Sequence, residues 1–259
     1  MQDLIIGLVQ TNTEWHNPEA NRHSIAKKIH GVTEKVDLFV LPEMFTTGFT
    51  MDVESNSEVH NGITGQWMQE LASTTGANIA GSIIIQENNK YYNRLYWVKP
   101  NGEITHYDKR HLFRMANEEK HFTEGNNQVI IDLNGWKIKP LICYDLRFPV
   151  WSRNTNLSYD VLLYVANWPQ LRIDAWDALL KARAIENLCY SVGVNRIGKD
   201  GTNKTYNGHS ACYNYKGQLL NNLSEDEQII FLTLSKPDLL DYRDKFPANL
   251  DADLFTIDK

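Results

Sequence analysis

Apolar runs of strand length alternate with helix-type patterns, and this alternation constrains the fold of the chain more than any other feature. Residues 4–10 (LIIGLVQ), 36–43 (VDLFVLPE) and 160–168 (DVLLYVANW) are short and mostly apolar, as buried strands are. Between the first two, Asn17 suits a helix N-cap and Pro18 the first helical position. The pattern predicts an α/β protein with large sheets and helices outside them.

Tight-turn signals divide the middle of the chain into hairpins. ENNK, KPNG and LNG separate residues 91–98, 103–109, 128–133 and 136–143, which predicts antiparallel strand pairs. We expect one domain over residues 1–259, built from two sheets packed on each other. Within the tail at 236–259, the last residues lose their periodicity although Phe246, Leu250, Leu254 and Phe255 need burial. We therefore expect the tail to contribute to a dimer contact.

Composition narrows the classes of partner. The net charge of −6 shows no basic excess of the kind that nucleic-acid binding needs. No apolar run approaches the roughly 18–20 residues of a membrane span, and the N-terminus lacks the basic segment of a signal peptide. Cys143, Cys189 and Cys212 are an odd number without metal-type spacing, which favours free thiols in a reducing compartment. We expect a cytoplasmic protein that acts on a small molecule, without nucleic acid, membrane, metal or cofactor.

Three predicted strands end in a chemically reactive side chain. Glu43, Lys109 and Cys143 each follow such a strand, and ligand sites gather where strands end and loops begin. Taken singly, each is more often a solvated charge or a packing residue. However, LPEMFTTGF surrounds Glu43 with apolar groups, and ICYDLRFP places the thiol at an abrupt strand-to-turn change, similar in logic to a nucleophile elbow. We expect the three side chains to meet at one sheet edge.

LPEMFTTGF, DKRHLF and ICYDLRFP together resemble the motifs of the nitrilase superfamily of carbon–nitrogen hydrolases, and residues 179–198 (LLKARAIENLCYSVGVNRIG) also resemble that family. Within it the chain is most similar to the ω-amidase branch. Those enzymes hydrolyse the terminal amide of small dicarboxylic monoamides such as 2-oxoglutaramate and 2-oxosuccinamate. The resemblance implies a four-layer α-β-β-α sandwich and a homodimer.

The resemblance also implies roles for individual residues. Glu43 matches the general base, Lys109 the catalytic lysine and Cys143 the nucleophile. A second glutamate assists in many members of the family, and Glu118, Glu119 and Glu124 are the alternatives. Glu118, seven residues before Gly125, fits the family pattern best.

These groups suit amide hydrolysis through a thioester, which divides one difficult step into two easier ones. We expect Lys109, together with the dipole of a short helix beginning near residue 150, to favour the thiolate of Cys143. Lys109 and the backbone N–H of Tyr144 would stabilise the oxyanion. A Cys–His mechanism is the rival, but none of the candidate histidines, among them His111, has an evident buried position beside an acid.

A substrate with a distant carboxylate needs a cation in its pocket. Arg172, in the loop after the strand at 160–167, is the candidate anchor, with Trp168 and Phe45 as pocket walls. Arg147 is expected to brace the Cys143 turn by pairing with an acid. A nitrile or N-carbamoyl hydrolase, or a non-catalytic scaffold of the same family, remain the alternatives.

Overall fold

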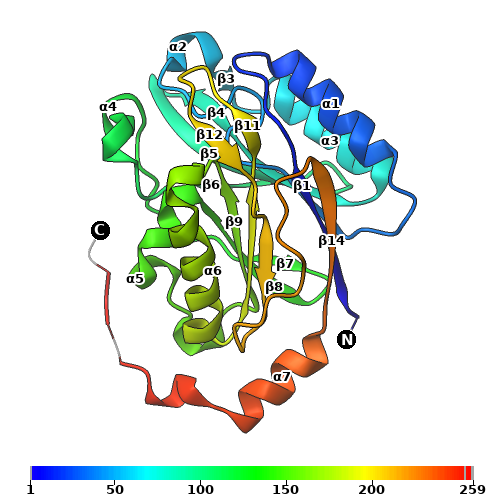
Figure 1. Ribbon diagram of the computed structural model, residues 1–259, viewed down its shortest axis with the longest axis vertical. Coiled ribbons are helices and arrows are strands. Elements are labelled where there is room, and N and C mark those ends of the chain that lie inside the picture. Colours follow the sequence, from blue (N-terminus) through cyan, green and yellow to red (C-terminus); the bar gives the residue numbers. More distant parts are fainter. Residues whose placement is uncertain (1, 254, 258–259) are drawn as a thin grey trace.

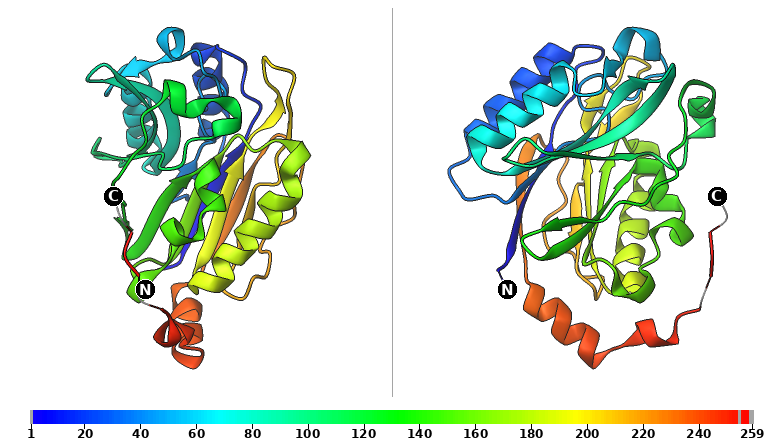
Figure 2. Two further views of the ribbon diagram at one scale, coloured as in Figure 1. Left: turned by 90° about the vertical axis from the view of Figure 1, so that its left-hand side faces the viewer. Right: turned by 180° about the vertical axis from the view of Figure 1, so that it is seen from behind.

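Two β-sheets pack face to face, and helices cover the outer face of each (Figures 1 and 2). The structure is a computed structural model that describes residues 2–253 and 255–257. The first sheet has seven strands, in the order β14 (Gln228–Leu234), β1 (Leu4–Gln10), β2 (Leu38–Val40), β4 (Asn78–Glu87), β5 (Lys90–Val98) and β6 (Ile104–Asp108), with β3 (Glu58–Val59) paired to β4. The second has five, in the order β13 (Ala211–Tyr213), β10 (Tyr190–Asn195), β9 (Val161–Ala166), β8 (Trp136–Ile142) and β7 (Ile131–Leu133).

The helices complete the layers. Helices α1 (Pro18–His30) and α3 (Ile63–Thr75) lie side by side on the first sheet, and α6 (Ile173–Asn187) lies on the second (Figure 1). The predicted four-layer α-β-β-α sandwich is therefore confirmed. Shorter elements connect the layers: α2 (Val53–Asn56), α4 (Glu118–His121), α5 (Pro149–Ser152) and the ribbon of β11 (Ile197–Lys199) and β12 (Thr205–Asn207).

Side-chain alternation along the strands creates two apolar layers. In β1, Leu4, Ile6 and Leu8 point between the two sheets, where they meet residues of β8, β9 and β10. In the neighbouring strand, Phe39 instead points outward and packs with Ile25 of α1. Successive residues of a strand face opposite sides, so the nearly continuous apolar runs of the sequence fill both layers at once.

Local sequence chemistry explains how two of the helices are placed. The side chain of Asn17 accepts a hydrogen bond from the Ala20 N–H at 3.2 Å, and Pro18 is the first helical residue, as predicted. At Gly193 of β10, an added Cβ would lie 2.6 Å from the Trp176 ring. Glycine is therefore required for α6 to pack this closely on the second sheet.

The C-terminal part of the chain is held at its start and exposed further on. Helix α7 (Lys236–Lys245) is anchored by Lys236 and Arg243, which both pair with the buried Asp160. Beyond it, a short turn, η5 (Ala248–Asp251), leads into extended chain (Figure 1). Phe246 is 54% exposed and Leu250 77%, and Leu254 lies outside the described residues. No helix among the described residues is both long and apolar enough to cross a membrane.

Candidate active site

Cys143 stands at a sharp turn directly after β8. It opens a 3₁₀ turn, η2 (Cys143–Arg147), with a φ of 41°, in the left-handed region that side chains other than glycine seldom adopt. Asp145 accepts hydrogen bonds from the Ile142 N–H at 3.0 Å and the Tyr107 hydroxyl at 2.8 Å. From the outer layer, Arg183 of α6 donates to the Leu146 carbonyl at 2.6 Å. The turn is thus held from both sides in a strained conformation that directs the thiol into the pocket described below.

His111 contributes to this turn and contacts the acid rather than the sulfur. Its Nδ1 lies 2.7 Å from Asp145 Oδ1, and its ring stacks on Phe148 with centroids 3.8 Å apart. The expectation that His111 lacks a buried acid beside it is therefore wrong. Nevertheless, the acid it contacts belongs to the framework of the turn, and no hydrogen bond joins His111 to Cys143 in the described structure. The geometry does not favour a Cys–His pair.

Lys109 lies at the centre of a buried ion cluster. It follows β6 directly, and its Nζ donates to Glu43 Oε1 at 2.9 Å and to Glu118 Oε1 and Oε2 at 3.0 and 2.9 Å. Glu43 and Glu118 are wholly buried, and Lys109 is 1% exposed. Glu43 comes from the loop after β2 and Glu118 from the start of α4. Three elements distant in sequence therefore place one ammonium between two carboxylates.

Asn93 completes this cluster, and the sequence analysis missed it. The strand register pairs Arg94 with Asp108, so that Asn93 lies opposite Lys109. Asn93 Nδ2 donates to Glu43 Oε1 at 2.8 Å and lies 3.4 Å from Glu118 Oε1. Asparagine is depleted in strands, so an asparagine inside YYNRLYWV was the available signal. With Lys109, Asn93 closes a ring of hydrogen bonds around both carboxylates.

The structure distinguishes the three candidate loop glutamates by position. The loop that carries them leaves the end of β6 at Lys109 and returns to it at Gly125, whose N–H donates to the Lys109 carbonyl at 2.9 Å. A Cβ on Gly125 would lie 2.2 Å from the Asp108 carbonyl oxygen, so the closure requires glycine. Glu118 reaches Lys109, whereas Glu119 lies 3.9 Å from Arg114 and Glu124 lies 3.4 Å from Arg110, both away from the cluster.

Glu43 is also fixed from the second sheet. The Asn167 N–H, after β9, donates to Glu43 Oε2 at 2.9 Å, and the Asn167 side chain donates to the Glu43 carbonyl at 2.5 Å. With Lys109 and Asn93, this gives the carboxylate three donors, two of which follow strand ends and one of which lies within β5. Its orientation is therefore set by both sheets, at the edge where their strands terminate.

Electrostatics around the cluster depend on the balance of burial and pairing. Burial alone would lower the pKa of Lys109, but Glu118 and Glu43 together raise it above its ordinary value. Burial also raises the pKa of Glu118, with the negative charge of Glu43 adding to the effect and Lys109 opposing it. The lysine is therefore firmly charged.

The Cys143 thiol is less acidic than an ordinary cysteine. Burial, and then the negative charge of Glu43, raise the pKa of Cys143 well above its ordinary value, and Lys109 only partly offsets them. Lys109 therefore favours the thiolate, as expected, but does not outweigh burial and the charge of Glu43. The expected helix dipole is also absent from this position, because α5 is a single turn that begins at Pro149, after the whole of η2. Cys143 rests as a neutral thiol beside a carboxylate that can accept its proton.

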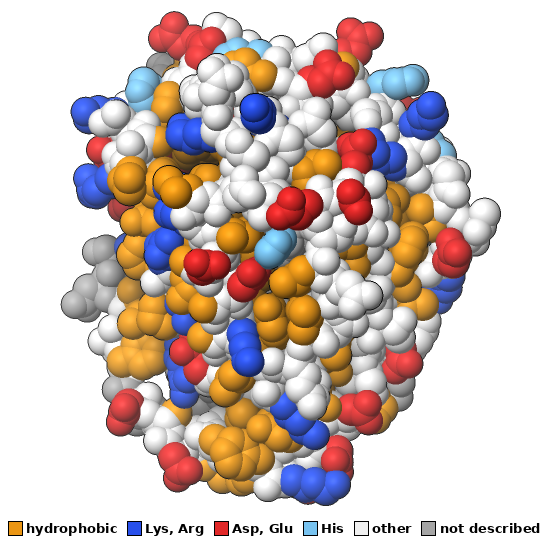
Figure 3. All heavy atoms as spheres, in the orientation of Figure 1, with side chains coloured by type: hydrophobic (Ala, Val, Ile, Leu, Met, Phe, Trp, Pro, Cys, Tyr) orange, Lys and Arg blue, Asp and Glu red, His pale blue; other side chains and the backbone are white. Residues whose placement is uncertain are grey.

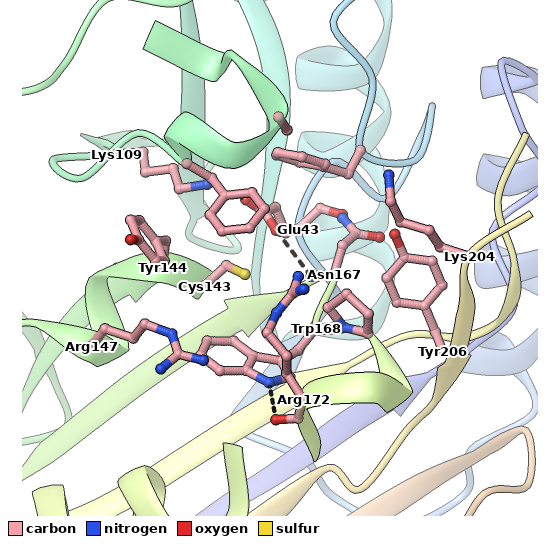
Figure 4. A pocket seen from close by; sticks show the side chains of 14 residues that line it. Glu43, Lys109, Cys143, Tyr144, Arg147, Asn167, Trp168, Arg172, Lys204 and Tyr206 are labelled. Atoms are coloured by element: carbon pink, nitrogen blue, oxygen red, sulfur yellow. Dashed lines mark hydrogen bonds and ion pairs between the residues drawn. The ribbon is translucent and has the colours of Figure 1, made fainter. Parts of the chain in front are cut away.

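A pocket opens above the sulfur (Figure 4). It encloses a cavity of about 40 Å³, which holds roughly three water-sized groups. Its lining comes from both sheets and from the β11–β12 ribbon, and consists of Glu43, Phe49, Lys109, Phe113, Ala116, Cys143, Tyr144, Arg147, Asn167, Trp168, Pro169, Arg172, Lys204 and Tyr206. Only a small acyl group fits the inner part.

Three cations surround the pocket mouth. Arg147 lies over the Trp168 ring at 4.9 Å, and Arg172 lies over the Phe113 ring at 5.1 Å. Neither guanidinium forms an ion pair with a described residue, so the predicted acid partner of Arg147 is wrong. Lys204, from the β11–β12 ribbon, lines the same mouth. Stacking fixes the two guanidinium groups while leaving donors free for an anion.

The predicted pocket residues are placed unequally. Tyr144, Trp168 and Arg172 line the pocket, as expected. Phe45 does not, because it is wholly buried in the layer under α1 and α3 and packs 5.8 Å from the Trp67 ring. The chain turns outward only after Gly48, whose φ is 76°. Phe49 therefore takes the wall position that was expected for Phe45.

The described side chains offer no evident metal site. Within the described residues, no three His, Cys, Asp or Glu side chains are arranged to hold a metal ion. What the cluster presents chemically is a neutral thiol, a carboxylate within reach of it, and an ammonium held between two carboxylates. Such a set can perform nucleophilic substitution at a carbonyl carbon.

Comparison with known proteins agrees with this chemistry. Residues 5–244 match the model of the carbon–nitrogen hydrolase family. The chain is 45% identical to ω-amidase YafV of Escherichia coli K12, over 99% of this chain and 100% of that one. It is 32% identical to the 2-oxoglutaramate amidase of Bacillus subtilis, over 94% and 95%. XC1258 of Xanthomonas campestris, a protein of the CN-hydrolase superfamily with an arsenic adduct in its active site, superimposes with a TM-score of 0.97 at 41% identity, over 100% of both chains.

Proposed function

The chain belongs to the carbon–nitrogen hydrolase family, in the ω-amidase-like branch of the nitrilase superfamily, and on that basis we propose that it hydrolyses the terminal amide of small dicarboxylic monoamides. The substrates are of the 2-oxoglutaramate and 2-oxosuccinamate type, and the products are the acid and ammonia. One observation carries the proposal: Cys143 opens into a small pocket beside Glu43 and Lys109, and the mouth of that pocket carries two arginines that have no carboxylate partner among the described residues.

In the first half of the reaction, Glu43 accepts the proton of the Cys143 thiol as the sulfur attacks the amide carbon. The new C–S bond forms while the carbonyl π electrons move to oxygen. Lys109 and the Tyr144 N–H donate to the resulting oxyanion, an interaction worth about 10²–10³ in rate per donor in other hydrolases. When the tetrahedral intermediate collapses, Glu43 gives the proton to the nitrogen, the C–N bond breaks, and ammonia leaves a thioester.

In the second half, water replaces the amine. Glu43, again a carboxylate, accepts a proton from water as its oxygen attacks the thioester carbon. Collapse breaks the C–S bond and returns that proton to sulfur, which regenerates the neutral thiol. Glu118 takes no proton directly from substrate in this scheme, since its contacts are with Lys109, Asn93 and the Phe113 N–H. We infer that it holds the ammonium in place.

The pocket mouth supports the dicarboxylic substrate class. Arg172 is our candidate for the carboxylate anchor and Trp168 for the adjoining wall, since the Arg172 carbonyl accepts from Trp168 Nε1 at 2.7 Å. Arg147 adds a second cation from the turn that carries Cys143 itself. The names of two relatives, ω-amidase and 2-oxoglutaramate amidase, support the same class.

Ammonia release tests the proposal. Cys143→Ala should abolish release from 2-oxoglutaramate, by roughly 10⁴-fold or more, with unchanged circular dichroism. Cys189→Ala is the matched control, because that thiol is buried beneath α6 and touches no substrate group. Full activity of Cys143→Ala would contradict the proposal. A strong preference for a nitrile or an N-carbamoyl amino acid would favour those alternatives, and a Cys143 inert to iodoacetamide would favour the scaffold.

We also infer one domain over residues 1–259, a cytoplasmic location and a homodimer. Three free thiols support the reducing compartment. The exposed side chains of Ile185, Phe246 and Leu250 support a subunit contact that includes the tail at 236–259. Figure 3 shows hydrophobic side chains gathered along the left side and the lower part of the view, on the side of the molecule where Figure 1 shows α6. Sedimentation velocity of the full chain and of a variant truncated after residue 245 measures this contact.

A further inference from the structure

Asn93 is buried in the ion cluster, but the mechanism above gives it no task. Its Nδ2 donates to Glu43 Oε1 at 2.8 Å and only weakly, at 3.4 Å, to Glu118 Oε1. Its Oδ1 is buried and has no hydrogen-bond partner among the described residues. The Asn93 side chain therefore acts here only as a hydrogen-bond donor, and its bond to Glu43 is stronger than its bond to Glu118.

We propose that Asn93 is a positioning residue that decides which glutamate beside Lys109 rests as the carboxylate, keeping the charge on Glu43 and leaving Glu118 to take any proton that the pair shares. The inference rests on the proposed roles of Glu43 and Cys143. It concerns which glutamate is ready to accept the thiol proton, since a protonated Glu43 could not act as a base.

The charge count makes such a choice necessary. One ammonium lies between two buried carboxylates, and both approach the same Lys109 nitrogen within 3.0 Å. Buried carboxylates this close resist being charged together, and their titrations are coupled. A proton taken up by the pair must therefore sit on one of them. The hydrogen bonds to each carboxylate decide which.

The donors to the two carboxylates differ. Glu43 Oε1 and both oxygens of Glu118 accept from Lys109, and the Oε2 of each has a backbone donor, from Asn167 and Phe113 respectively. Lys109 thus favours the charge on Glu118, and Asn93 opposes this preference, because its bond to Glu43 is 0.6 Å shorter than its approach to Glu118. A hydrogen bond to the charged form stabilises that form. Burial and the Glu43 charge also raise the pKa of Glu118, in the same direction.

The other ionisable groups facing the cluster do not replace Asn93. Cys143 approaches Glu43 from η2 as a neutral thiol, and Tyr206 acts on Glu43 from β12 with a raised pKa and therefore as a neutral phenol. The Cys143 thiol and the Tyr206 phenol are present in the wild type and in every Asn93 variant, so they cannot account for a difference between them. Among the described residues, the neutral carboxamide of Asn93 is thus the one uncharged donor within reach of both glutamates.

The test compares pH profiles of Asn93→Ala, Glu118→Gln and the double variant. The acid limb of kcat for 2-oxoglutaramate should rise by about one to two pH units in Asn93→Ala, since a hydrogen bond to a charged group is worth about that much. KM should change less than about threefold. In the Glu118→Gln background the shift should be smaller, because the lost hydrogen bond still disfavours the charged form of Glu43 but no second carboxylate remains to exchange the proton with it. A uniform loss at every pH, or an equal shift in both backgrounds, would overturn the proposal.

Two control variants separate the effect of the Asn93 donor from a loss of packing. The isosteric Asn93→Asp variant replaces the amide donor with a carboxylate and leaves no cavity. The added negative charge should move the acid limb of kcat to a still higher pH than in Asn93→Ala. Asn78→Ser, at a buried asparagine of β4 that bonds the Asp37 carbonyl and Trp97, should lower stability and leave the limb in place. If no amide is hydrolysed, the proposed function fails. The pH dependence of Cys143 alkylation by iodoacetamide still reports the Asn93 shift, and an unshifted midpoint would refute it.

Discussion

Two lysines in this molecule are equally buried and have opposite electrostatic surroundings. Lys109, after β6 of the first sheet, is 1% exposed, and Lys139, in β8 of the second sheet, is 2% exposed. Lys109 donates to Glu43 and Glu118. Within the described part of the chain, Lys139 donates only to neutral groups, the Gln128 Oε1 at 2.9 Å and the Trp151 carbonyl at 2.6 Å.

The pKa values of the two amines move in opposite directions. Burial lowers the pKa of Lys139 to about 8, while the carboxylates raise that of Lys109 in spite of equal burial. Burial therefore does not determine the charge of an amine by itself; carboxylates within bonding distance do. At neutral pH, Lys109 keeps a positive charge at the pocket beside Cys143, where the proposed mechanism needs it, whereas Lys139 ties β8, the strand that leads to Cys143, to Gln128 and Trp151.

The largest expected effect comes from removing the paired lysine. Lys109→Met should lower kcat/KM by at least about 10³-fold, because the main oxyanion donor is lost. It should also lower the free energy of unfolding by roughly 3–5 kcal/mol, since two buried carboxylates lose their counter-charge. Urea unfolding and ammonia release measure both. Wild-type stability in this variant would show that the carboxylates do not need the ammonium.

The layered fold was predictable because its signal is local. Apolar runs such as residues 4–10 and 161–166 and the cap at Asn17 act through nearest neighbours, and turn signals near Asn134 and Gly135 identify the β7–β8 hairpin. The three reactive side chains were predictable because each ends a strand. Their meeting follows from strand ends sharing one edge of a sheet sandwich.

The remaining site residues could not be read from local pattern. Asn93 acts through its cross-strand neighbour Lys109, a relation that depends on register. Phe45 and Phe49 look equivalent in the sequence, and only the turn at Gly48 assigns one to the core and the other to the pocket. The raised pKa of Cys143 depends on burial, which composition around a strand end does not measure.

Arg147 and Arg172 are a third kind of cation, because their neighbours are aromatic rings. Arg172→Gln should raise KM for 2-oxoglutaramate by about 10- to 100-fold with kcat nearly unchanged, because a charge-assisted bond to the substrate carboxylate is lost. Arg147→Gln should do the same to a similar or smaller extent. Neither should lower stability by more than about 1 kcal/mol, because no buried carboxylate loses its partner. An unchanged KM in both variants would place the anchor elsewhere, with Lys204→Gln as the next variant to measure.

The smallest expected effect concerns Lys139, and its sign depends on pH. With a pKa of about 8 folded and 10.5 unfolded, Lys139 binds fewer protons in the native state between those values. Stability therefore rises with pH across that window, and below about pH 8 the buried charge costs the full amount. Relative to Lys139→Met, the wild type should gain up to about 3 kcal/mol between pH 7 and 10.5. Activity at pH 7.5 should change less than about threefold. If the difference in unfolding free energy between the wild type and Lys139→Met does not change over this pH range, the Lys139 amine is paired as effectively as that of Lys109.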